Sequence, residues 1–336
     1  MIRVGILGAT GYTALELIRI LIRHPEVEIG ALTTRQSGRP AASSVHPSLA
    51  GKLDLPLEDL SPEQVIERCD CVFSCLPHAA SAEVVKVLVD AGRRVIDFSA
   101  DYRLNDAEVY QTWYGETHPD PERLGRVPYG LPELFASQIS QAPLVANPGC
   151  YPTAVVLALA PLLAARLIHR EGIILDAKSG VSGAGRTPKM VTIFPECNES
   201  IMPYNVGQHR HTPEIDQLLG QLAGAPVQAI FTPHLAPMDR GILTTAYTLP
   251  VGDTTETAAA DALRDFYAEQ PFVTVVDTLP ATKHVSGTNH CHLAVRKVRD
   301  RLLVFSCIDN LLKGASGAAV QNFNWMFGFP EATALI

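Results

Sequence analysis

The sequence of 336 residues lacks the features that mark several common classes of protein. Lys and Arg number 27 against 35 Asp and Glu, and the net charge of −8 argues against a nucleic-acid surface, which needs clustered cations. No apolar run reaches the roughly 18 residues of a membrane-spanning helix. Seven cysteines in so long a chain fall short of the density of a disulfide scaffold. Nucleic-acid binding, membrane insertion and a disulfide framework are therefore not expected.

What the sequence does have is apolar material for buried cores, with 47% hydrophobic and 18% charged residues. A chain of this length is expected to form two domains of about 100–200 residues each. The opening MIRVGILGATGY runs directly into glycines and does not resemble a signal peptide. Together with the odd number of cysteines, this favours a cytoplasmic location.

Strand-like and helix-like patterns alternate over the first hundred residues. Short apolar runs predict strands, and two stretches with helical spacing separate them: strands at 2–7, 27–33, 71–76 and 94–98, helices at 14–22 and 79–91. Residues 37–60 are rich in Ser, Pro and Gly and predict loops. The alternation predicts an α/β, Rossmann-type domain with a doubly wound parallel sheet.

The pattern changes near residue 144, where a short strand at 144–147 precedes a long apolar helix at 153–168. The rest of the chain is rich in strand-like runs, at 173–179, 227–232, 242–249, 272–276, 292–298 and 302–308. Helical patterns fall at 212–222, 257–268 and 315–327. This order predicts a second α/β domain around a largely antiparallel sheet.

A glycine-rich turn follows the first strand, with glycines at Gly5, Gly8 and Gly11. Such a turn lets the backbone approach a pyrophosphate at a helix N-terminus, although the same glycines could serve a tight turn without a ligand. Its place between strand and helix favours a dinucleotide. The residues expected to contact it are Gly8, Ala9, Thr10, Gly11, Tyr12 and Thr13.

The end of the second strand distinguishes the two nicotinamide cofactors. NAD-selective domains usually have an acidic residue there for the ribose hydroxyl. Here the stretch reads LTTRQS, and Arg35 and Ser37 offer a cation and a hydroxyl to a 2′-phosphate instead. The sequence therefore favours NADP.

The hexapeptide NPGCYP places Cys150 on a turn at the start of a helix. A helix N-terminus stabilises a thiolate, and its backbone N–H groups can bind a developing oxyanion. A buried structural cysteine is the alternative, but the turn favours a nucleophile. The other six cysteines lie in strand-like runs or lack a partner and are interpreted as structural: Cys69, Cys71, Cys75, Cys197, Cys291 and Cys307.

A second polar cluster, HRHTPE, contains His209 and His211 just before a helix, for which Thr212 would be the N-cap. Histidine titrates near neutrality and is the usual proton shuttle. Glu214 could orient the ring of His211. No Cys or His pair has zinc spacing, so a metal site is not expected.

Two loops carry candidate anion contacts. The first, SADYR, contains Arg103 and follows the fourth strand at the edge where ligands bind such sheets. The second, KSGVSGAGR, contains Ser182 and Gly183, and its backbone could approach a cofactor ring or a phosphate. Either loop could instead be a solvated surface turn.

These motifs, taken in order, resemble the N-acetyl-γ-glutamyl-phosphate reductase family: GATGY, SADYR, YGLPE, NPGCYPT, SGVSGAGR, HRHTPEI and DNLLKGASGAAVQN. The resemblance implies NADPH-dependent reduction of an acyl phosphate through a thioester on Cys150, as a homodimer or homotetramer. It implies His211 as acid/base, with His209 as the alternative. Substrate contacts would be Arg103, which would hold the phosphate, Asn147 and Glu214.

The resemblance also implies that the last helix returns to the first domain and that Asn310 lies near the nicotinamide. The expected domains are therefore residues 1–147 with 313–336, which bind NADP, and residues 148–312, which carry catalysis and oligomerisation. Aspartate-semialdehyde dehydrogenase and the aminoadipate-type reductases share this chemistry and are alternatives within the same class. A non-catalytic NADP-sensing protein is the alternative from another class.

Overall fold

The computed structural model describes all residues from 1 to 336, and the chain divides into two compact units. The first unit comprises Met1–Pro148 and Ala315–Ile336, and the second comprises Gly149–Gly314. These boundaries lie within one or two residues of the positions that the sequence pattern suggests.

The first unit contains a six-stranded, entirely parallel sheet with the order β3-β2-β1-β4-β5-β6. Its strands are β1 (Ile2–Leu7), β2 (Val27–Thr33), β3 (Leu57–Glu58), β4 (Cys71–Ser74), β5 (Arg94–Asp97) and β6 (Leu144–Ala146). The chain moves outward from β1 to β3 and then returns to β4 on the other side of β1. This is the doubly wound order with a switch point between β1 and β4, and it confirms the predicted Rossmann-type fold.

Both faces of this sheet are covered by helices. Successive side chains of a strand point to opposite faces, so neighbouring residues of one strand pack on different helices. Val72 of β4 belongs to a buried cluster with Val85 and Leu88 of α4 (Ala80–Asp90). Its neighbour Phe73 packs against Phe323 with ring centroids 5.8 Å apart. The remaining helices of this unit are α1 (Tyr12–Leu21), α2 (Ala42–Val45), α3 (Pro62–Arg68), α5 (Ala107–Tyr114), α6 (Pro132–Ile139) and α12 (Gly317–Phe327).

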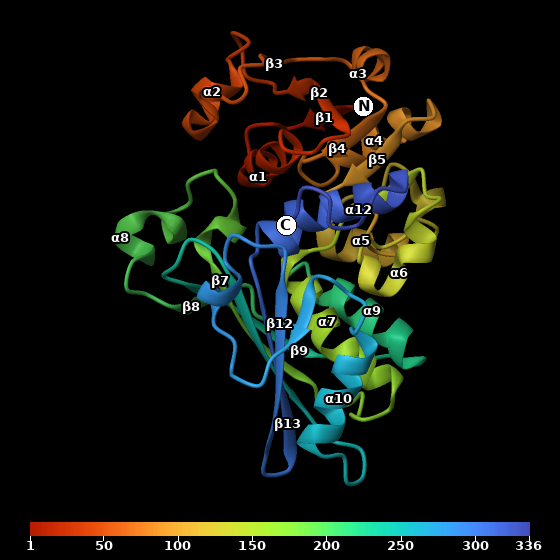
Figure 1. The fold of residues 1–336 in the computed structure, drawn as a ribbon, viewed down its shortest axis with the longest axis vertical. Helices are drawn as coiled ribbons and strands as arrows, with labels where there is room; N and C mark the ends of the chain where they lie inside the picture. The colour runs from red at the N-terminus through yellow and green to blue at the C-terminus, as the bar shows by residue number, and fades with distance from the viewer. The chain divides into compact units, whose positions relative to one another are not determined.

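The C-terminal helix α12 belongs to the first unit although it follows the whole of the second (Figure 1). It packs on α1, α6 and β5. Its polar side chains are buried and bonded there: Gln321 Nε2 donates to Glu133 (3.0 Å), and Asn322 Nδ2 donates to the carbonyl of Gly130 (2.8 Å). The polar residues of α12 can be buried because they bond to polar groups of α6 and of the turn before α6.

The second unit contains a seven-stranded mixed sheet with the order β11-β12-β13-β10-β7-β9-β8. Its strands are β7 (Ile174–Gly180), β8 (Met202–Pro203), β9 (Ile230–Ala236), β10 (Ile242–Thr248), β11 (Val273–Val275), β12 (Cys291–Val298) and β13 (Arg301–Ile308). Pairs β7–β9 and β11–β12 are parallel, and the other four neighbouring pairs are antiparallel. The expectation of a largely antiparallel sheet is confirmed.

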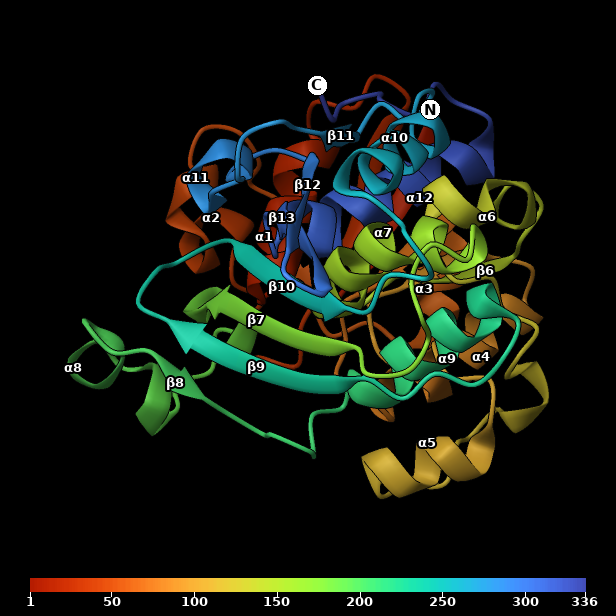
Figure 2. The same ribbon diagram turned by 90° about the horizontal axis from the view of Figure 1, so that it is seen from below.

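Three helices lie on this sheet's side of the unit: α7 (Cys150–Ala164), α9 (Thr212–Ala223) and α10 (Glu256–Phe266) (Figure 2). Helix α7 packs against β10 and β13 and α10 against β12, and both α9 and α10 pack on α7. Helix α7 starts three residues earlier than predicted and ends four residues earlier. It ends early because Arg166 adopts a left-handed φ of 55°, and the N–H of Leu167 turns back to the carbonyl of Leu162 (2.9 Å).

The second unit also has two short helices, α8 (Phe194–Cys197) and α11 (Thr282–Val285). A π-helical turn at Leu312–Ser316 begins in the second unit, ends in the first and leads into α12. None of the helices has both the length and the apolar character needed to cross a membrane.

Candidate active site

The glycine turn of the first unit links β1 to α1. Gly8 has a left-handed φ of 71°, and a Cβ atom there would lie 2.9 Å from the carbonyl oxygen of Cys75. The turn is fixed to the end of β2, since Gly8 N–H donates to Thr33 Oγ1 (3.2 Å) and Ala9 N–H to Thr33 O (2.8 Å). Gly11 is the N-cap of α1, and a Cβ there would meet only Thr13 Oγ1, at 3.9 Å. The helix N-terminus is therefore open to an anion, which fits a dinucleotide pyrophosphate.

Arg35 and Ser37 follow β2 and are exposed. No acidic residue lies between the end of this strand and Arg39, whose guanidinium pairs with Glu58. The residues present therefore fit a 2′-phosphate better than a free ribose hydroxyl.

Arg103 and Asn147 meet in the first unit, where Arg103 is held by main-chain carbonyls. Its Nε donates to Asn147 O and its Nη2 to Phe98 O, both at 2.7 Å. The Asn147 amide donates to Ala315 O (3.0 Å) and accepts from Asn322 Nδ2 (3.1 Å). Asn147 thus ties the end of β6 to the returning C-terminal segment. This fixes the backbone three residues before Cys150.

Cys150 is the first residue of α7, and Gly149 is its N-cap. The N–H of Gly149 donates to Oε1 of Glu214 (3.0 Å), a fully buried carboxylate in the first turn of α9. This bond lets Glu214 fix the turn that carries the cysteine. That Glu214 also orients His211 stays a prediction. The N-terminus of α7 provides the oriented N–H groups that favour a thiolate.

His209 is enclosed by aromatic rings and has both nitrogens engaged. Its Nδ1 accepts the main-chain N–H of His211 (3.1 Å), so the neutral ring carries its proton on Nε2, which donates to Tyr204 Oη (3.3 Å). Tyr204 donates to Tyr151 Oη (3.1 Å), and Tyr151 donates to the carbonyl of His234 (3.3 Å). Burial, with a smaller contribution from Arg210, lowers the pKa of His209 to about 4. His209 is therefore neutral near pH 7.

His211 lies beside this network. Its ring centroid is 4.9 Å from that of His209 and 5.9 Å from that of Tyr151, the residue next to Cys150. The structure corrects one detail of the sequence pattern: α9 begins at Thr212, so His211 rather than Thr212 is its N-cap. His211 already has helical backbone angles, which extends the turn by one residue and leaves the helix without a side-chain cap.

Ser182, Gly183 and Asn310 also come together in the second unit. Asn310 Oδ1 accepts Gly241 N–H (2.7 Å), and its Nδ2 donates to Ser182 Oγ (3.0 Å), which in turn donates to Asp239 O (2.6 Å). A Cβ on Gly183 would lie 3.6 Å from the Asn310 amide nitrogen. These side chains hold the loop after β7 against the turn before β10.

The candidate residues fall into two groups. The glycine turn, Arg35, Ser37, Arg103 and Asn147 lie in the first unit, and Cys150, Ser182, Gly183, His209, His211, Glu214 and Asn310 lie in the second. The sequence pattern missed Tyr151 and Tyr204. Tyr151 adjoins the cysteine and could have been considered, but Tyr204 lies in an exposed stretch with no signal.

Four of the other cysteines, Cys69, Cys71, Cys75 and Cys307, have the character of structural residues, and no cysteine is in a disulfide. Burial raises the pKa of Cys69 to about 11 and those of Cys75 and Cys307 to about 12, which keeps these thiols protonated. Cys71 is fully buried, and its pKa is raised still further.

A Rossmann-type unit joined to a mixed-sheet unit, with a cysteine at a helix start, defines the semialdehyde dehydrogenase class. Two family models agree: "Semialdehyde dehydrogenase, NAD binding domain" matches residues 3–142, and "Semialdehyde dehydrogenase, dimerisation domain" matches residues 150–310. The first unit is thus a nicotinamide-dinucleotide-binding domain, as the glycine turn predicts.

Curated relatives narrow the class. The chain is 54% identical to an N-acetyl-gamma-glutamyl-phosphate reductase of Rhodopirellula baltica and 50% identical to one of Citrifermentans bemidjiense; each alignment covers 100% of this chain and 98% of the relative. The chain belongs to the N-acetyl-gamma-glutamyl-phosphate reductase family, as its motifs predict.

Solved structures confirm the fold. Aspartate semialdehyde dehydrogenase II from Vibrio cholerae superposes with a TM-score of 0.74 at 16% identity, covering 98% of both chains. Aspartate semialdehyde dehydrogenase with NADP from Candida albicans gives 0.72 at 17%, covering 97% of this chain and 98% of that chain.

Proposed function

We propose that this protein reduces N-acetyl-γ-glutamyl phosphate to N-acetylglutamate 5-semialdehyde and phosphate, with NADPH as the reductant, in arginine biosynthesis. The observation that carries the proposal is Cys150 at the first position of α7, with Glu214 on the preceding N–H and His211 beside Tyr151. The full-length similarity to reductases of that name supports the substrate.

In this mechanism the Cys150 thiolate attacks the acyl carbon, phosphate leaves, and a thioester remains on the enzyme. The glycine turn and Arg35 would hold NADPH, which would supply the hydride for reduction of the thioester. His211 acts as the acid/base: it takes the proton of the Cys150 thiol and returns a proton to sulfur or oxygen when the C–S bond of the hemithioacetal breaks and the aldehyde is released. His209 positions His211 by accepting its main-chain N–H. Arg103 holds the substrate phosphate. Asn147 and Glu214 support the turn of the nucleophile and are proposed as further substrate contacts.

The match of the second unit to a dimerisation domain supports a homodimer or homotetramer. The absence of disulfides fits the reducing cytoplasm. Ser182, Gly183 and Asn310 form the part of the second unit that faces the nicotinamide in this proposal.

The test is oxidation of NADPH by the purified protein with N-acetyl-γ-glutamyl phosphate, aspartyl phosphate or an N-acetylaminoadipyl phosphate. Turnover is expected with the first compound, and in reverse with the semialdehyde, phosphate and NADP. Faster turnover of another acyl phosphate would move the protein to a related pathway. NADP binding without turnover of any of them would indicate the non-catalytic alternative.

A further inference from the structure

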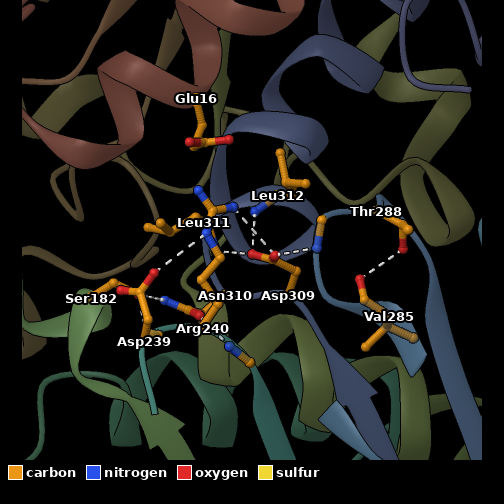
Figure 3. Close-up of polar contacts among 12 residues, drawn as sticks. Glu16, Ser182, Asp239, Arg240, Val285, Thr288, Asp309, Asn310, Leu311 and Leu312 are labelled. Atoms are coloured by element: carbon orange, nitrogen blue, oxygen red, sulfur yellow. Dashed lines mark hydrogen bonds and ion pairs between the residues drawn. The ribbon is translucent and has the colours of Figure 1, made fainter. Parts of the chain in front are cut away.

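The carboxylate of Asp309 joins three segments of the second unit (Figure 3). Asp309 follows β13 and is completely buried. Its Oδ1 accepts the N–H groups of Leu311 (2.8 Å) and Leu312 (3.1 Å). Its Oδ2 accepts Gly287 N–H (2.8 Å) and Arg240 Nη1 (3.4 Å). The first pair of bonds shapes the turn after β13, and the second pair anchors that turn to two other loops.

The turn that Asp309 shapes leads into the π-helical turn Leu312–Ser316. Single π-helical turns are rare and occur often at functional sites. The carbonyl of Asp309 accepts the N–H of Gly314 (2.9 Å). Between these two residues Lys313 is fully buried, with its ammonium 5.6 Å from the ring centroid of Phe272. The backbone from Asp309 to Gly314 is thus fixed by hydrogen bonds at both of these residues and by the buried side chain of Lys313 between them.

Gly314 lies directly against the cysteine. A Cβ atom on Gly314 would be 2.8 Å from Cys150 Cβ and 3.3 Å from Cys150 Cα. Real Cβ atoms do not approach that closely, so the backbone of this turn forms one wall of the space in which the Cys150 side chain rotates. A shift of the turn by a few tenths of an ångström would change that wall.

We propose that Asp309 is a positioning residue for Cys150 and that it acts through the π-helical turn and Gly314. The inference rests on the proposed function, in which Cys150 is the nucleophile. Asp309 sets the course of the turn, the turn places a residue without a side chain at Cys150, and the thiol is confined to an attacking orientation.

The direct test is Asp309→Asn, which keeps the size and the acceptor for Leu311 and Leu312 but turns an NH₂ group toward Gly287 N–H and Arg240. The readout is the second-order rate constant for iodoacetamide modification of Cys150, followed by peptide mass spectrometry. That reaction requires neither substrate nor cofactor, so it is independent of the proposed reaction. We expect the rate constant and kcat to fall together by about tenfold to a hundredfold. The KM and the NADPH affinity should stay within about twofold of wild type.

Partial unfolding would give a different result, because unfolded chains would expose the buried cysteines, which would then be alkylated together with Cys150. The matched control is Asp216→Asn, which removes a carboxylate of α9 that accepts Ala229 N–H (2.9 Å) and should leave the alkylation rate unchanged. A wild-type rate constant in folded Asp309→Asn would overturn the proposal.

Gly314→Ala tests the same contact from the other side and decides the question if Asp309→Asn does not fold. The added methyl must displace Cys150, so alkylation is expected to slow by at least about tenfold. Gly220→Ala is its control, because a Cβ there meets no atom closer than 3.4 Å. An unchanged rate in Gly314→Ala would refute the role of the turn.

If neither variant folds, Arg240→Gln replaces them, since it removes the side-chain bond to Asp309. Alkylation of Cys150 slowed about threefold would support the proposal, and a wild-type rate would overturn it.

Discussion

The candidate residues of the first unit come mainly from one short stretch, whereas those of the second unit come from stretches that are far apart in the sequence. The glycine turn, residues 8–13, is continuous and contacts the end of β2 through main-chain and threonine groups. In the second unit Cys150, Tyr204, His209 and Gly314 belong to three separate stretches of chain.

The two regions also use their polar groups differently. The first unit offers backbone N–H groups and exposed side chains such as Arg35, which suits a ligand whose recognition is mainly of its phosphates. At the second unit's site, Glu214, Tyr204 and Tyr151 already bond to other groups of the protein before any substrate arrives. We infer that changes at Cys150 and at the two histidines should affect the rate of the chemical step, and that changes at the glycine turn and Arg35 should affect cofactor affinity.

The largest expected effect is that of Cys150→Ser. A serine hydroxyl is not ionised near neutral pH, so the covalent step should be lost and kcat should fall by on the order of 10⁴-fold or more. NADPH binding, measured by fluorescence titration, should stay at the wild-type value because the glycine turn is untouched. Retention of more than a few per cent of the activity would exclude the thioester mechanism.

The next largest effect is expected at the two histidines, whose substitutions should reduce kcat by different amounts. His211→Ala is expected to slow turnover by roughly 10²–10⁴-fold, the usual contribution of a positioned acid/base. His209→Asn keeps an acceptor for the main-chain N–H of His211 and should cost less than about tenfold. Steady-state kcat and its pH profile give the comparison. A larger loss in His209→Asn than in His211→Ala would reverse the two roles.

His209 should also make the stability of the second unit depend on pH. Its pKa is about 4 in the folded protein and 6.5 ordinarily, so above pH 6.5 the ring is neutral in both states. Below pH 6.5 the unfolded chain takes up a proton that the folded chain does not, and the free energy of unfolding falls until about pH 4. The linkage amounts to at most about 3 kcal/mol. Denaturant titrations at several pH values should show a shallower loss in His209→Asn than in wild type, and parallel curves would contradict the prediction.

A smaller effect, confined to the first unit, is expected from Arg35→Ala. Loss of one exposed cation should raise the KM for NADP about tenfold and leave the KM for NAD nearly unchanged. Arg39→Ala is the control, since its guanidinium already pairs with Glu58. Equal changes for both cofactors would refute the contact with the 2′-phosphate while leaving the reaction class intact.

The smallest effect concerns backbone strain in the turn that follows β4. Ala79 has φ 67° and ψ −54°, and its N–H donates to Asp101 Oδ1 (2.9 Å). Glycine tolerates this conformation, so Ala79→Gly should raise the free energy of unfolding by up to about 1 kcal/mol. Ala80→Gly, one residue on and already helical, should lower it by less than about 1 kcal/mol. Thermal unfolding of both variants measures the difference, and a destabilised Ala79→Gly would show that the turn is unstrained.

The sequence alone predicted most strands of both units and the longer helices α1, α4, α7, α9, α10 and α12, because their apolar periodicity reflects which faces are buried. It missed the short helices, such as α2, α8 and α11, which have too few residues to show a period. It also predicted the glycine turn and the helix start at Cys150, because each depends on a few consecutive residues: a left-handed glycine, and a turn that starts a helix. The role of Cys150 as nucleophile stays a prediction. The family followed from motifs in a fixed order.

Only the tertiary structure decided which residues of the second unit act together. The different roles that we propose for His209 and His211 depend on Tyr204, which bonds to His209. Tyr204 lies beside this ring because of the path of the chain between β8 and α9. The importance of Asp309 depends on bonds to loops 22 and 69 residues away. Gly314 appears in the sequence as one glycine among many, and its contact with Cys150 exists only because β13 returns to the start of α7. Close packing between distant segments leaves no periodic signal, since each contact is set by the whole fold rather than by neighbouring residues.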